Sequence, residues 1–453
     1  MSYQEALGLL KTRVKIFSPI ANRGLQKRND DLSRVRRWGK ALGHDRKTFD
    51  VIHVTGTKGK GTTCAWTQAL IQSYFQSNSI NAKVGRYTSP HLYTPRERIA
   101  INSVQVSENV FAKHFFQVWN TILADVNGNS ESMPGFLQFM ALLSAEIFNR
   151  VGVAVAVYEV HAGGRFDATN MWDDTMVCGF NTIALDHVPM LGNNVKEIAR
   201  NKAGILKSGC RAFSVQQSND ARQELEAEAA QLKCDLNFVE TNESLIPKDP
   251  SGKDLRPADL NNLQLAIELA NAYLFSKHNG RLSSKHVAEA MHIYNLPGRA
   301  QILEETESST RWYLDIAHND ISIPVALDWF ISEVWQAGHH PRVLIFGASS
   351  AQRNTDDVVR TLVRSCIARG FTFDEIVLAS HQSSLDESIL FTKDVACRTM
   401  DLWKEMKVVP SFQTIEQAIK SIRHADLGYQ VLITGSAHLV SSAMLAMQSQ
   451  TER

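Results

Sequence analysis

Short runs of β-branched and aliphatic residues recur along the chain and are separated by longer segments in which apolar residues repeat at helical spacing. The runs predict buried strands, and the spaced segments predict amphipathic helices. In the first 296 residues we expect strands at 51–55, 82–87, 151–157 and 176–185. Helices are expected at 65–74, 107–125, 136–149, 218–232, 257–276 and 284–293, and another helix carries Lys196, Lys202 and Lys207.

Two stretches of this half are less regular. Residues 1–50 look mostly helical, with Leu7, Leu10, Val14 and Phe17 on one face of a first helix that Pro19 would end. Residues 235–256 have the weakest pattern, and we interpret them as a surface loop with one strand.

After Leu296-Pro-Gly-Arg299, which we interpret as a hinge, strands and helices alternate cleanly. The strands are expected at 311–315, 342–347, 374–379 and 429–434, and the helices at 321–335, 355–369, 387–406, 414–424 and 437–448. This alternation predicts a parallel, doubly wound sheet. We therefore expect an α/β protein with two domains, 1–296 and 297–453, since 453 residues exceed what one core usually holds.

Composition and charge indicate which classes of partner and which redox state to expect. The net charge of +1 gives no general attraction to nucleic acid, and no apolar run approaches the length of a membrane span. The first residues lack a charged segment followed by an apolar one, so we see no secretory signal. The six cysteines have no paired spacing and are expected to be reduced, mostly buried thiols rather than a disulfide framework or a zinc site.

A glycine-rich segment follows the first predicted strand and precedes a predicted helix. It reads Gly56-Thr-Lys-Gly-Lys-Gly-Thr-Thr63. In this arrangement backbone N–H groups approach a phosphate, Lys60 contributes a point charge, and the hydroxyl of Thr62 or Thr63 is available to Mg²⁺. The spacing departs from the strict consensus, so a simple turn between strand and helix stays open as the alternative.

Other strand ends also carry polar groups. Glu159 ends an apolar run, His187 follows the strand predicted at 176–185, and Ser89 follows the one at 82–87. A buried carboxylate must be paired or must bind a metal, and a mostly oxygen set with one imidazole suits Mg²⁺ better than zinc. In the second half a predicted strand again ends in an acid, Asp315, and His318 follows three residues later. Alternatively, Asp315 caps a helix and His318 is simply a hydrogen-bonded imidazole.

Nine ordered motifs resemble those of folylpolyglutamate synthases, a family of the Mur ligase superfamily, and most of all its eukaryotic branch. They are Gly56-Thr-Lys-Gly-Lys-Gly-Thr-Thr-Cys-Ala65, Tyr87-Thr-Ser-Pro-His-Leu92, Arg96-Glu-Arg-Ile-Ala-Ile-Asn102, Glu159-Val-His-Ala-Gly-Gly-Arg-Phe-Asp-Ala-Thr-Asn170, Leu185-Asp-His-Val-Pro-Met-Leu-Gly192, Ala199-Arg-Asn-Lys-Ala-Gly-Ile-Leu-Lys207, Pro297-Gly-Arg299, Leu314-Asp-Ile-Ala-His318 and Thr434-Gly-Ser-Ala-His-Leu439. The resemblance implies an N-terminal P-loop ATPase-like ligase domain and a C-terminal Rossmann-like domain.

The resemblance also implies an activity and its residues. An ATP-dependent ligase of this kind joins L-glutamate to a folate carboxylate through an acyl phosphate. By resemblance, the residues that bind ATP are Gly56, Thr57, Lys58, Gly59, Lys60, Gly61, Thr62, Asn262, Arg299, Asp315 and His318. Those that surround Mg²⁺ are Thr62, Ser89, Glu159 and His187, and Lys60, Lys202 and His187 are implied to be catalytic, with Lys202 carbamylated. We expect a cytoplasmic monomer without nucleic-acid or membrane partners, and a mitochondrial form remains compatible with the sequence.

Some positions depart from the family pattern. His161 and Ala162 replace a glycine and a bulky aliphatic residue, Ala258-Asp259 replaces a His-Gln pair, and Ile316 replaces a glycine. His161 either crowds Glu159 or contacts an unusual substrate. Two alternatives therefore stay open: a divergent ligase of the same family that joins another carboxylate and amine, and a catalytically weak folate-binding relative.

Overall fold

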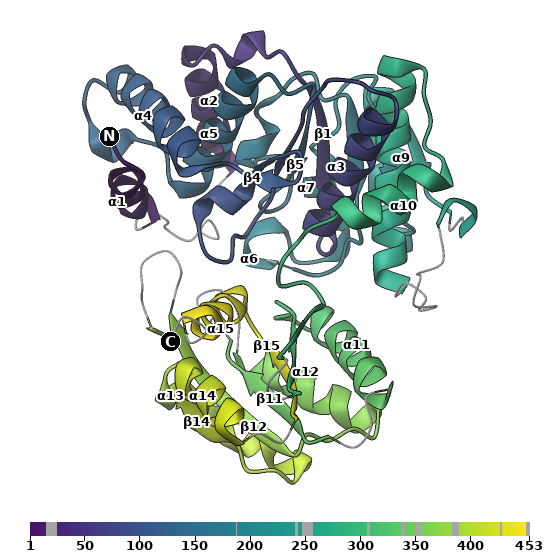
Figure 1. Ribbon diagram of the computed structural model, residues 1–453. Helices are drawn as coiled ribbons and strands as arrows, with labels where there is room; N and C mark the ends of the chain where they lie inside the picture. Colours follow the sequence, from purple (N-terminus) through teal and green to yellow (C-terminus); the bar gives the residue numbers. More distant parts are fainter. Residues whose placement is uncertain are drawn as a thin grey trace. The chain divides into compact units, whose positions relative to one another are not determined.

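The computed structural model describes residues 1–14, 25–186, 188–240, 243–246, 257–305, 309–336, 340–348, 355–382, 389–425 and 428–449. The chain forms two compact units. The first comprises Met1–Ser89 and Pro95–Leu296, and the second comprises Pro90–Thr94 and Pro297–Arg453 (Figure 1). Each unit is a sheet with helices on both faces, so the α/β class predicted from the alternation is confirmed. Within the described residues, no helix is both long and apolar enough to cross a bilayer.

The sheet of the first unit has the strand order β4-β3-β2-β5-β1-β6-β7-β8. The strands are β1 (Asp50–Thr55), β2 (Val84–Tyr87), β3 (Ile99–Ile101), β4 (Val104–Gln105), β5 (Val155–Glu159), β6 (Val177–Phe180), β7 (Arg211–Ser214) and β8 (Asp235–Phe238). The pairs from β2 to β8 are parallel, while β3 and β4 are antiparallel additions. The carboxyl ends of β2, β5, β1 and β6 therefore meet along one edge, which is where ligands bind in open α/β sheets.

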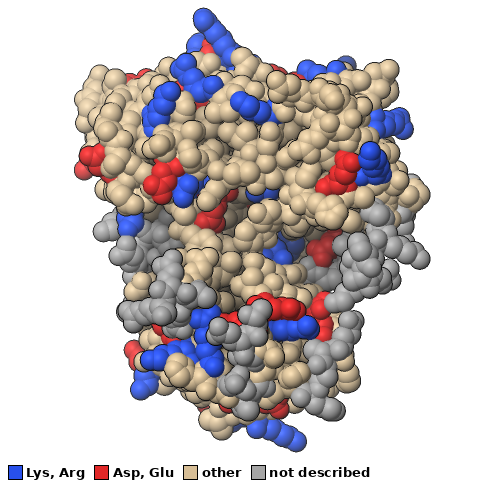
Figure 2. Space-filling view, viewed as in Figure 1, with Lys and Arg blue, Asp and Glu red and all other residues tan. Residues whose placement is uncertain are grey.

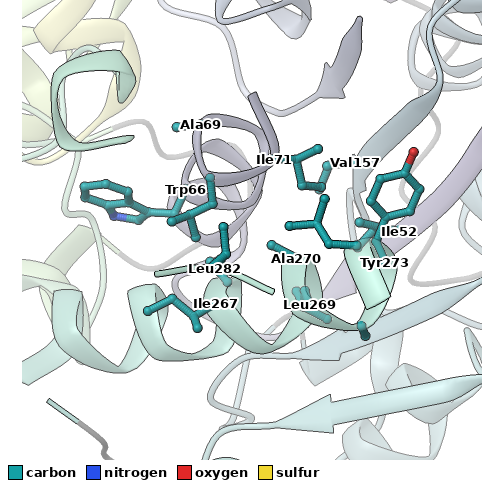
Figure 3. Close-up of a cluster of buried hydrophobic side chains, with 14 of the residues drawn as sticks. Ile52, Trp66, Ala69, Ile71, Val157, Ile267, Leu269, Ala270, Tyr273 and Leu282 are labelled. Atoms are coloured by element: carbon teal, nitrogen blue, oxygen red, sulfur yellow. The ribbon is translucent and has the colours of Figure 1, made fainter. Parts of the chain in front are cut away.

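One face of this sheet is covered by α3 (Lys60–Ser77), α9 (Pro257–His278) and α10 (Ser284–Ile293), which pack against one another (Figure 1). Figure 3 shows Trp66 and Ile71 of α3 and Ile267 of α9 in the shared core, together with Val157 from the sheet. The helix α3 is buried nearly all round because it lies between the strands and α9. This packing fixes the start of α3, and with it the glycine-rich segment.

The other face takes the alternate side chains of the same strands. Tyr158 of β5 contacts the rings of Phe148 and Trp172. Cys178 and Phe180 of β6 pack into a second cluster beneath α7 (Val195–Ala203) and α8 (Asn219–Leu232). The remaining helices are α1 (Tyr3–Val14), α2 (Leu25–Ala41), α4 (Glu108–Asp125), α5 (Phe136–Val151) and the single turn α6 (Val188–Leu191).

The sheet of the second unit has the order β13-β12-β11-β15-β10-β9, with β14 also paired to β12. The strands are β9 (Gln301–Glu304), β10 (Arg311–Leu314), β11 (Arg342–Phe346), β12 (Glu375–Gln382), β13 (Ile389–Leu390), β14 (Ser411–Thr414) and β15 (Gln430–Thr434). The helices are α11 (Ser322–Gln336), α12 (Thr355–Ala368), α13 (Lys393–Thr399), α14 (Ile415–Ala425) and α15 (Ala437–Ser449). The four pairs that join β14, β12, β11, β15 and β10 are parallel, as the alternating pattern predicted.

Several predicted elements have different bounds. The run 151–157 is not one strand, because α5 continues to Val151 and ends at Gly152, which has a left-handed φ of 70°. The predicted strand 176–185 is only β6, Val177–Phe180. Lys207 lies beyond α7 rather than on the helix that carries Lys202.

Two further predictions were wrong in detail. The single helix expected at 387–406 is the strand β13, the helix α13 and a 3₁₀ segment, Met400–Met406. In α1 the buried positions are Tyr3, Ala6, Leu10 and Arg13, so the stripe is rotated from the one predicted. Phe17 and Pro19 lie outside the described residues.

Candidate active site

The glycine-rich segment connects the buried strand β1 to the first turn of α3. Gly59 is the residue before the helix and has φ 85°, and Gly56 has φ 148°. Both values favour glycine. A Cβ at Gly56 would stand 2.6 Å from the Cβ of Asn181, and one at Gly59 would collide with Oδ1 of Asn262. The loop is therefore a tightly fitted strand-to-helix connection with its backbone N–H groups near a helix N-terminus, as an anion site requires.

Neighbouring strand ends hold this loop in place. The Thr57 N–H donates to the carbonyl of Thr182, which follows β6, at 2.7 Å. The Thr57 hydroxyl also lies 3.1 Å from both the carbonyl oxygen and the backbone nitrogen of Ala184. The loop between β1 and α3 is thus bonded to the segment that leads from β6 toward His187. His187 itself lies outside the described residues.

Asn181 is a site residue that the sequence reading missed. Its side chain is fully buried, and its Nδ2 donates to Thr63 Oγ1 and to Asn262 Oδ1, both at 2.9 Å. Its Oδ1 has no hydrogen-bond partner among the described residues. Asn181 therefore ties the end of β6 to α3 and α9 directly beneath Gly56 and Gly59. The signal for it was a polar residue inside the run that we took for one long strand.

We expect Asn181→Ala to weaken Mg-ATP binding and to lower the free energy of unfolding by about 1–3 kcal/mol, since it leaves buried partners unpaired. Both quantities can be followed by thermal unfolding with and without Mg-ATP. Asn237→Ala is the matched control, because Asn237 is exposed on β8 and its side-chain amide donates to Asp235 two residues earlier. Equal nucleotide-dependent stabilisation in wild type and Asn181→Ala would contradict the assignment.

Glu159 ends β5 beside β1 and is almost fully buried. Its Oε2 accepts the Ser89 N–H at 2.8 Å, and its Oε1 lies 4.0 Å from Lys60 Nζ. Gly61 lies against the same carboxylate, since a Cβ there would be 3.1 Å from Oε2. The acid is therefore held between the first turn of α3 and the segment after β2, next to the lysine of the loop.

The donor set here fits a hard divalent cation. The Glu159 carboxylate and the buried hydroxyl of Thr62 are oxygen ligands, which Mg²⁺ prefers, and it commonly takes its remaining ligands from water and phosphate. Among the described residues, no group of three or more His, Cys, Asp or Glu side chains is arranged to hold a metal.

Lys202 reaches the loop from α7 on the other face of the sheet. Its ammonium donates to the Gly56 carbonyl at 2.8 Å, and its side chain is buried. Burial, reinforced by the nearby charges of Lys60 and Lys58, lowers the pKa of Lys202 to about 7, although Asp186 and Asp167 oppose the shift. A buried lysine with such a pKa is partly a neutral amine at physiological pH, which is the nucleophilic form.

Comparison with known proteins assigns the chain to a family. No protein-family model matches the chain. A folylpolyglutamate synthase of Neurospora crassa is 31% identical to it, over 97% of this chain and 90% of its own length. The chain belongs to the folylpolyglutamate synthase family. One from Candida albicans is 29% identical, over 100% of this chain and 97% of its own length.

The fold has a matching solved structure. A Mycobacterium tuberculosis folylpolyglutamate synthase, complexed with ADP and AMPPCP, aligns with a TM-score of 0.75 and 21% identity, over 93% of this chain and 95% of that chain. The resemblance predicted from the motifs is confirmed. So is the likeness to the eukaryotic branch, because the two sequence relatives named above come from fungi.

His161, one of the departures from the family pattern, has two polar partners in the structure. Its Nε2 lies 2.7 Å from the Tyr87 hydroxyl and its Nδ1 lies 3.3 Å from Asp167. Burial alone would raise the pKa of Asp167, but the charge of His161 and hydrogen bonds from His161, Thr169 and the Ala162 N–H lower it well below its usual range. The His161 ring thus belongs to a buried polar network that braces the loop after β5.

Three residues that the family resemblance assigns to the nucleotide belong to the second unit. Asp315 accepts the N–H groups of Ala300 and Ala317, both at 2.9 Å. The ring Nδ1 of His318 lies 2.7 Å from the Ile316 carbonyl oxygen. Asp315 does not cap a helix, because Asn319 accepts the N–H of Ser322, where α11 begins. Arg299 lies in the turn between Gly298 and Ala300 that Asp315 braces.

The other departures fall on the same unit or on α9. Ile316 is buried, and its N–H donates to the Gly298 carbonyl at 3.1 Å, so the bulky residue packs into the core behind the turn. Asp259 lies in the first turn of α9, three residues before Asn262. The side chain of Ala258 lies outside the described residues.

The exposed arginines of α2 form ion pairs. Arg34, Arg36 and Arg37 of α2 are exposed, and each lies within 2.6–3.3 Å of an aspartate oxygen. Over the part of this unit that Figure 2 shows, Lys and Arg side chains are interspersed with Asp and Glu. These three arginines therefore form a solvated, ion-paired helix face.

Proposed function

We propose that this protein is an ATP-dependent ligase that adds L-glutamate to the γ-carboxylate of a tetrahydrofolate and releases ADP and phosphate. The observation that carries the proposal is the pairing of Lys60 with Glu159 at the phosphate loop, in a chain of the folylpolyglutamate synthase family. The structural neighbour that binds ADP and AMPPCP supports ATP as the nucleotide.

The residues of the first unit have distinct roles in this reaction. A carboxylate is a poor electrophile, and transfer of a phosphoryl group from ATP turns it into an acyl phosphate with a good leaving group. Lys60 and the N–H groups of the loop stabilise charge on the phosphoryl oxygens, which is where most catalysis of phosphoryl transfer arises. Thr62, Glu159, Ser89 and His187 would hold Mg²⁺, which supplies further charge neutralisation when bound.

A second set of residues completes the proposal. Asn262, which bonds to Asn181 beside the loop, and Arg299, Asp315 and His318 of the second unit are proposed to bind the nucleotide. The amine of L-glutamate then attacks the acyl carbon, the tetrahedral intermediate loses phosphate, and the amide remains. The protein is proposed to work as a cytoplasmic monomer on small molecules alone.

We also propose that Lys202 is carbamylated in the working enzyme. Its lowered pKa leaves a large fraction of neutral amine, which reacts with carbon dioxide to give a carbamate and a proton. The change converts a buried cation beside the Gly56 carbonyl into an anion able to serve a metal. Incubation with ¹³C-bicarbonate should give a carbamate carbon signal in wild type and none in Lys202→Met.

The proposed function is tested by ADP release and by the mass of the product. Purified protein with Mg-ATP, L-glutamate and tetrahydrofolate should release ADP and give a product heavier by one glutamyl residue, and omission of any substrate should stop both. Turnover of other carboxylates without any response to tetrahydrofolate would instead indicate a divergent ligase. Binding of folate without turnover would indicate a folate-binding relative.

A further inference from the structure

Three cysteines meet at the amino-terminal edge of the first sheet, away from the phosphate loop. Cys178 lies in β6, Cys210 directly precedes β7, and Cys234 directly precedes β8. Their separations in the sequence gave no sign of this. All are free thiols, in agreement with the sequence-based expectation, yet the strand order β6-β7-β8 brings them side by side.

The sulfur atoms are close enough to react with one another. Cys210 Sγ lies 3.5 Å from Cys234 Sγ and 3.9 Å from Cys178 Sγ. Cys210 and Cys234 precede the register pair Arg211 and Asp235 of two adjacent parallel strands, and the Asp235 N–H donates to the Cys210 carbonyl at 3.1 Å. Adjacent strands are about 4.8 Å apart, within the range of Cα separations that a disulfide spans.

Exposure distinguishes the three thiols. Cys234 is partly exposed, Cys210 is 6% exposed and Cys178 is fully buried. The pair formed by Cys210 and Cys234 is therefore the one within reach of a small reagent from solvent. Cys178 lies behind Cys210 in the core beneath α7 and α8.

The surroundings favour a thiolate at Cys210. The side-chain hydrogen bond with Cys178 lowers the pKa of Cys210. The backbone N–H of Lys207, 3.5 Å from the Cys210 sulfur, and the charge of Lys207 lower this pKa further, although burial opposes the shift. Burial and the neighbouring Cys210 raise the pKa of Cys234, whose thiol donates to the Lys207 carbonyl at 2.9 Å. A thiolate is the nucleophilic form of cysteine and the one that peroxides oxidise.

We propose that Cys210 and Cys234 form a reversible disulfide when the protein meets hydrogen peroxide. The Cys210 thiolate attacks one peroxide oxygen, the O–O bond breaks, and hydroxide leaves, so that Cys210 becomes a sulfenic acid. The sulfur of Cys234 then attacks the Cys210 sulfur, the S–S bond forms, and hydroxide leaves and takes up the Cys234 proton. The proton that Cys210 released when it ionised neutralises the first hydroxide. In sum, two thiols lose two electrons and two protons, and the peroxide is reduced to two molecules of water.

The disulfide would act on the segment that joins α7 to β7. Its formation removes the bond from Cys234 to the Lys207 carbonyl. The Lys207 ammonium donates to Asn170 Oδ1 at 2.7 Å, and the Asn170 amide donates to the Gly204 carbonyl at 3.0 Å. The proposed disulfide therefore lies at the end of the segment that leads from α7, which carries Lys202, to β7.

The test is a direct search for the linked peptides. Reduced full-length protein is treated with hydrogen peroxide, alkylated, digested with trypsin and analysed by mass spectrometry. We expect peptide 208–211, which holds Cys210, to be joined to peptide 234–248, and dithiothreitol to separate them. Alkylation of both cysteines as free thiols after peroxide, or a link between Cys210 and the peptide that holds Cys178, would overturn the proposal.

Two variants provide the controls. Cys234→Ser should remove the link and leave a Cys210 sulfenic acid that a dimedone probe labels. Cys366→Ser should keep the link, because Cys366 is buried in α12 of the second unit. Loss of the link in Cys366→Ser would contradict the assignment. The wild-type measurement needs no variant to fold, so the proposal stays testable in any case.

Discussion

Lys60→Ala protein should lose ligase activity by about a hundredfold or more, which is the usual cost of removing one donor aimed at developing charge. Lys60 begins α3, and its ammonium lies 4.0 Å from Oε1 of Glu159. Its removal takes away the lysine charge that we propose to stabilise the phosphoryl oxygens. The measurement is the rate of ADP release with saturating Mg-ATP, L-glutamate and tetrahydrofolate.

A matched lysine elsewhere provides the control for Lys60→Ala. Lys285 is exposed in α10 and forms a surface pair with Glu289, so Lys285→Ala should retain wild-type activity. Since Lys60→Ala also leaves Glu159 without its ammonium, thermal unfolding of both variants separates lost catalysis from lost folding. A folded Lys60→Ala protein with wild-type turnover would exclude the role of Lys60.

Lys202→Ala should lose most of the activity, because the change removes the donor to the Gly56 carbonyl and the amine that we propose to be carbamylated. If the carbamate is the working form, small carboxylates such as formate should partly restore turnover by occupying the vacated position. Lys196→Ala is the control on the same helix, since Lys196 is a half-exposed residue paired with Glu224. Full activity in Lys202→Ala would exclude both roles.

The lowered pKa of Lys202 also predicts how stability depends on pH. In the unfolded chain the lysine pKa is about 10.4, whereas the folded value is about 7. Between these pH values the unfolded state binds more protons than the folded state, so the free energy of unfolding increases with rising pH. The thermal midpoint of unmodified wild type, relative to Lys202→Met, should therefore rise from about pH 7 to about pH 10. A constant difference across this window would exclude the shift.

Local pattern predicted most elements of the fold, and its failures have physical causes. An apolar run does not distinguish a buried helix end from a buried strand, which is why the run 151–157 concealed the end of α5 at Val151. Segment 387–406 has helical spacing, yet Phe391 adopts φ 56° between β13 and α13. A single left-handed residue of this kind leaves no trace in hydrophobic periodicity.

The site was predictable where one short segment carries the chemistry. The loop around Lys60 and the acid that ends β5 both follow from strand ends and glycine spacing. Asn181 was not predictable in this way, since its importance comes from bonds to Thr63 and Asn262, which only the packing of β6, α3 and α9 brings together. The three cysteines were missed for the same reason, because strand order is a tertiary property.

The second unit includes the short segment Pro90–Thr94, which lies within the first half of the sequence. Leu92 is buried in the core that β10, β15 and α15 share, and the Ser441 hydroxyl donates to its carbonyl. A fragment that starts at residue 297 would lack this piece of its own core. Exchange of the C-terminal half between homologues by recombination at the hinge would likewise pair one parent's Leu92 with the other parent's Ser441. For the second unit to be transferred between proteins as a whole, Pro90–Thr94 and Pro297–Arg453 would have to change together.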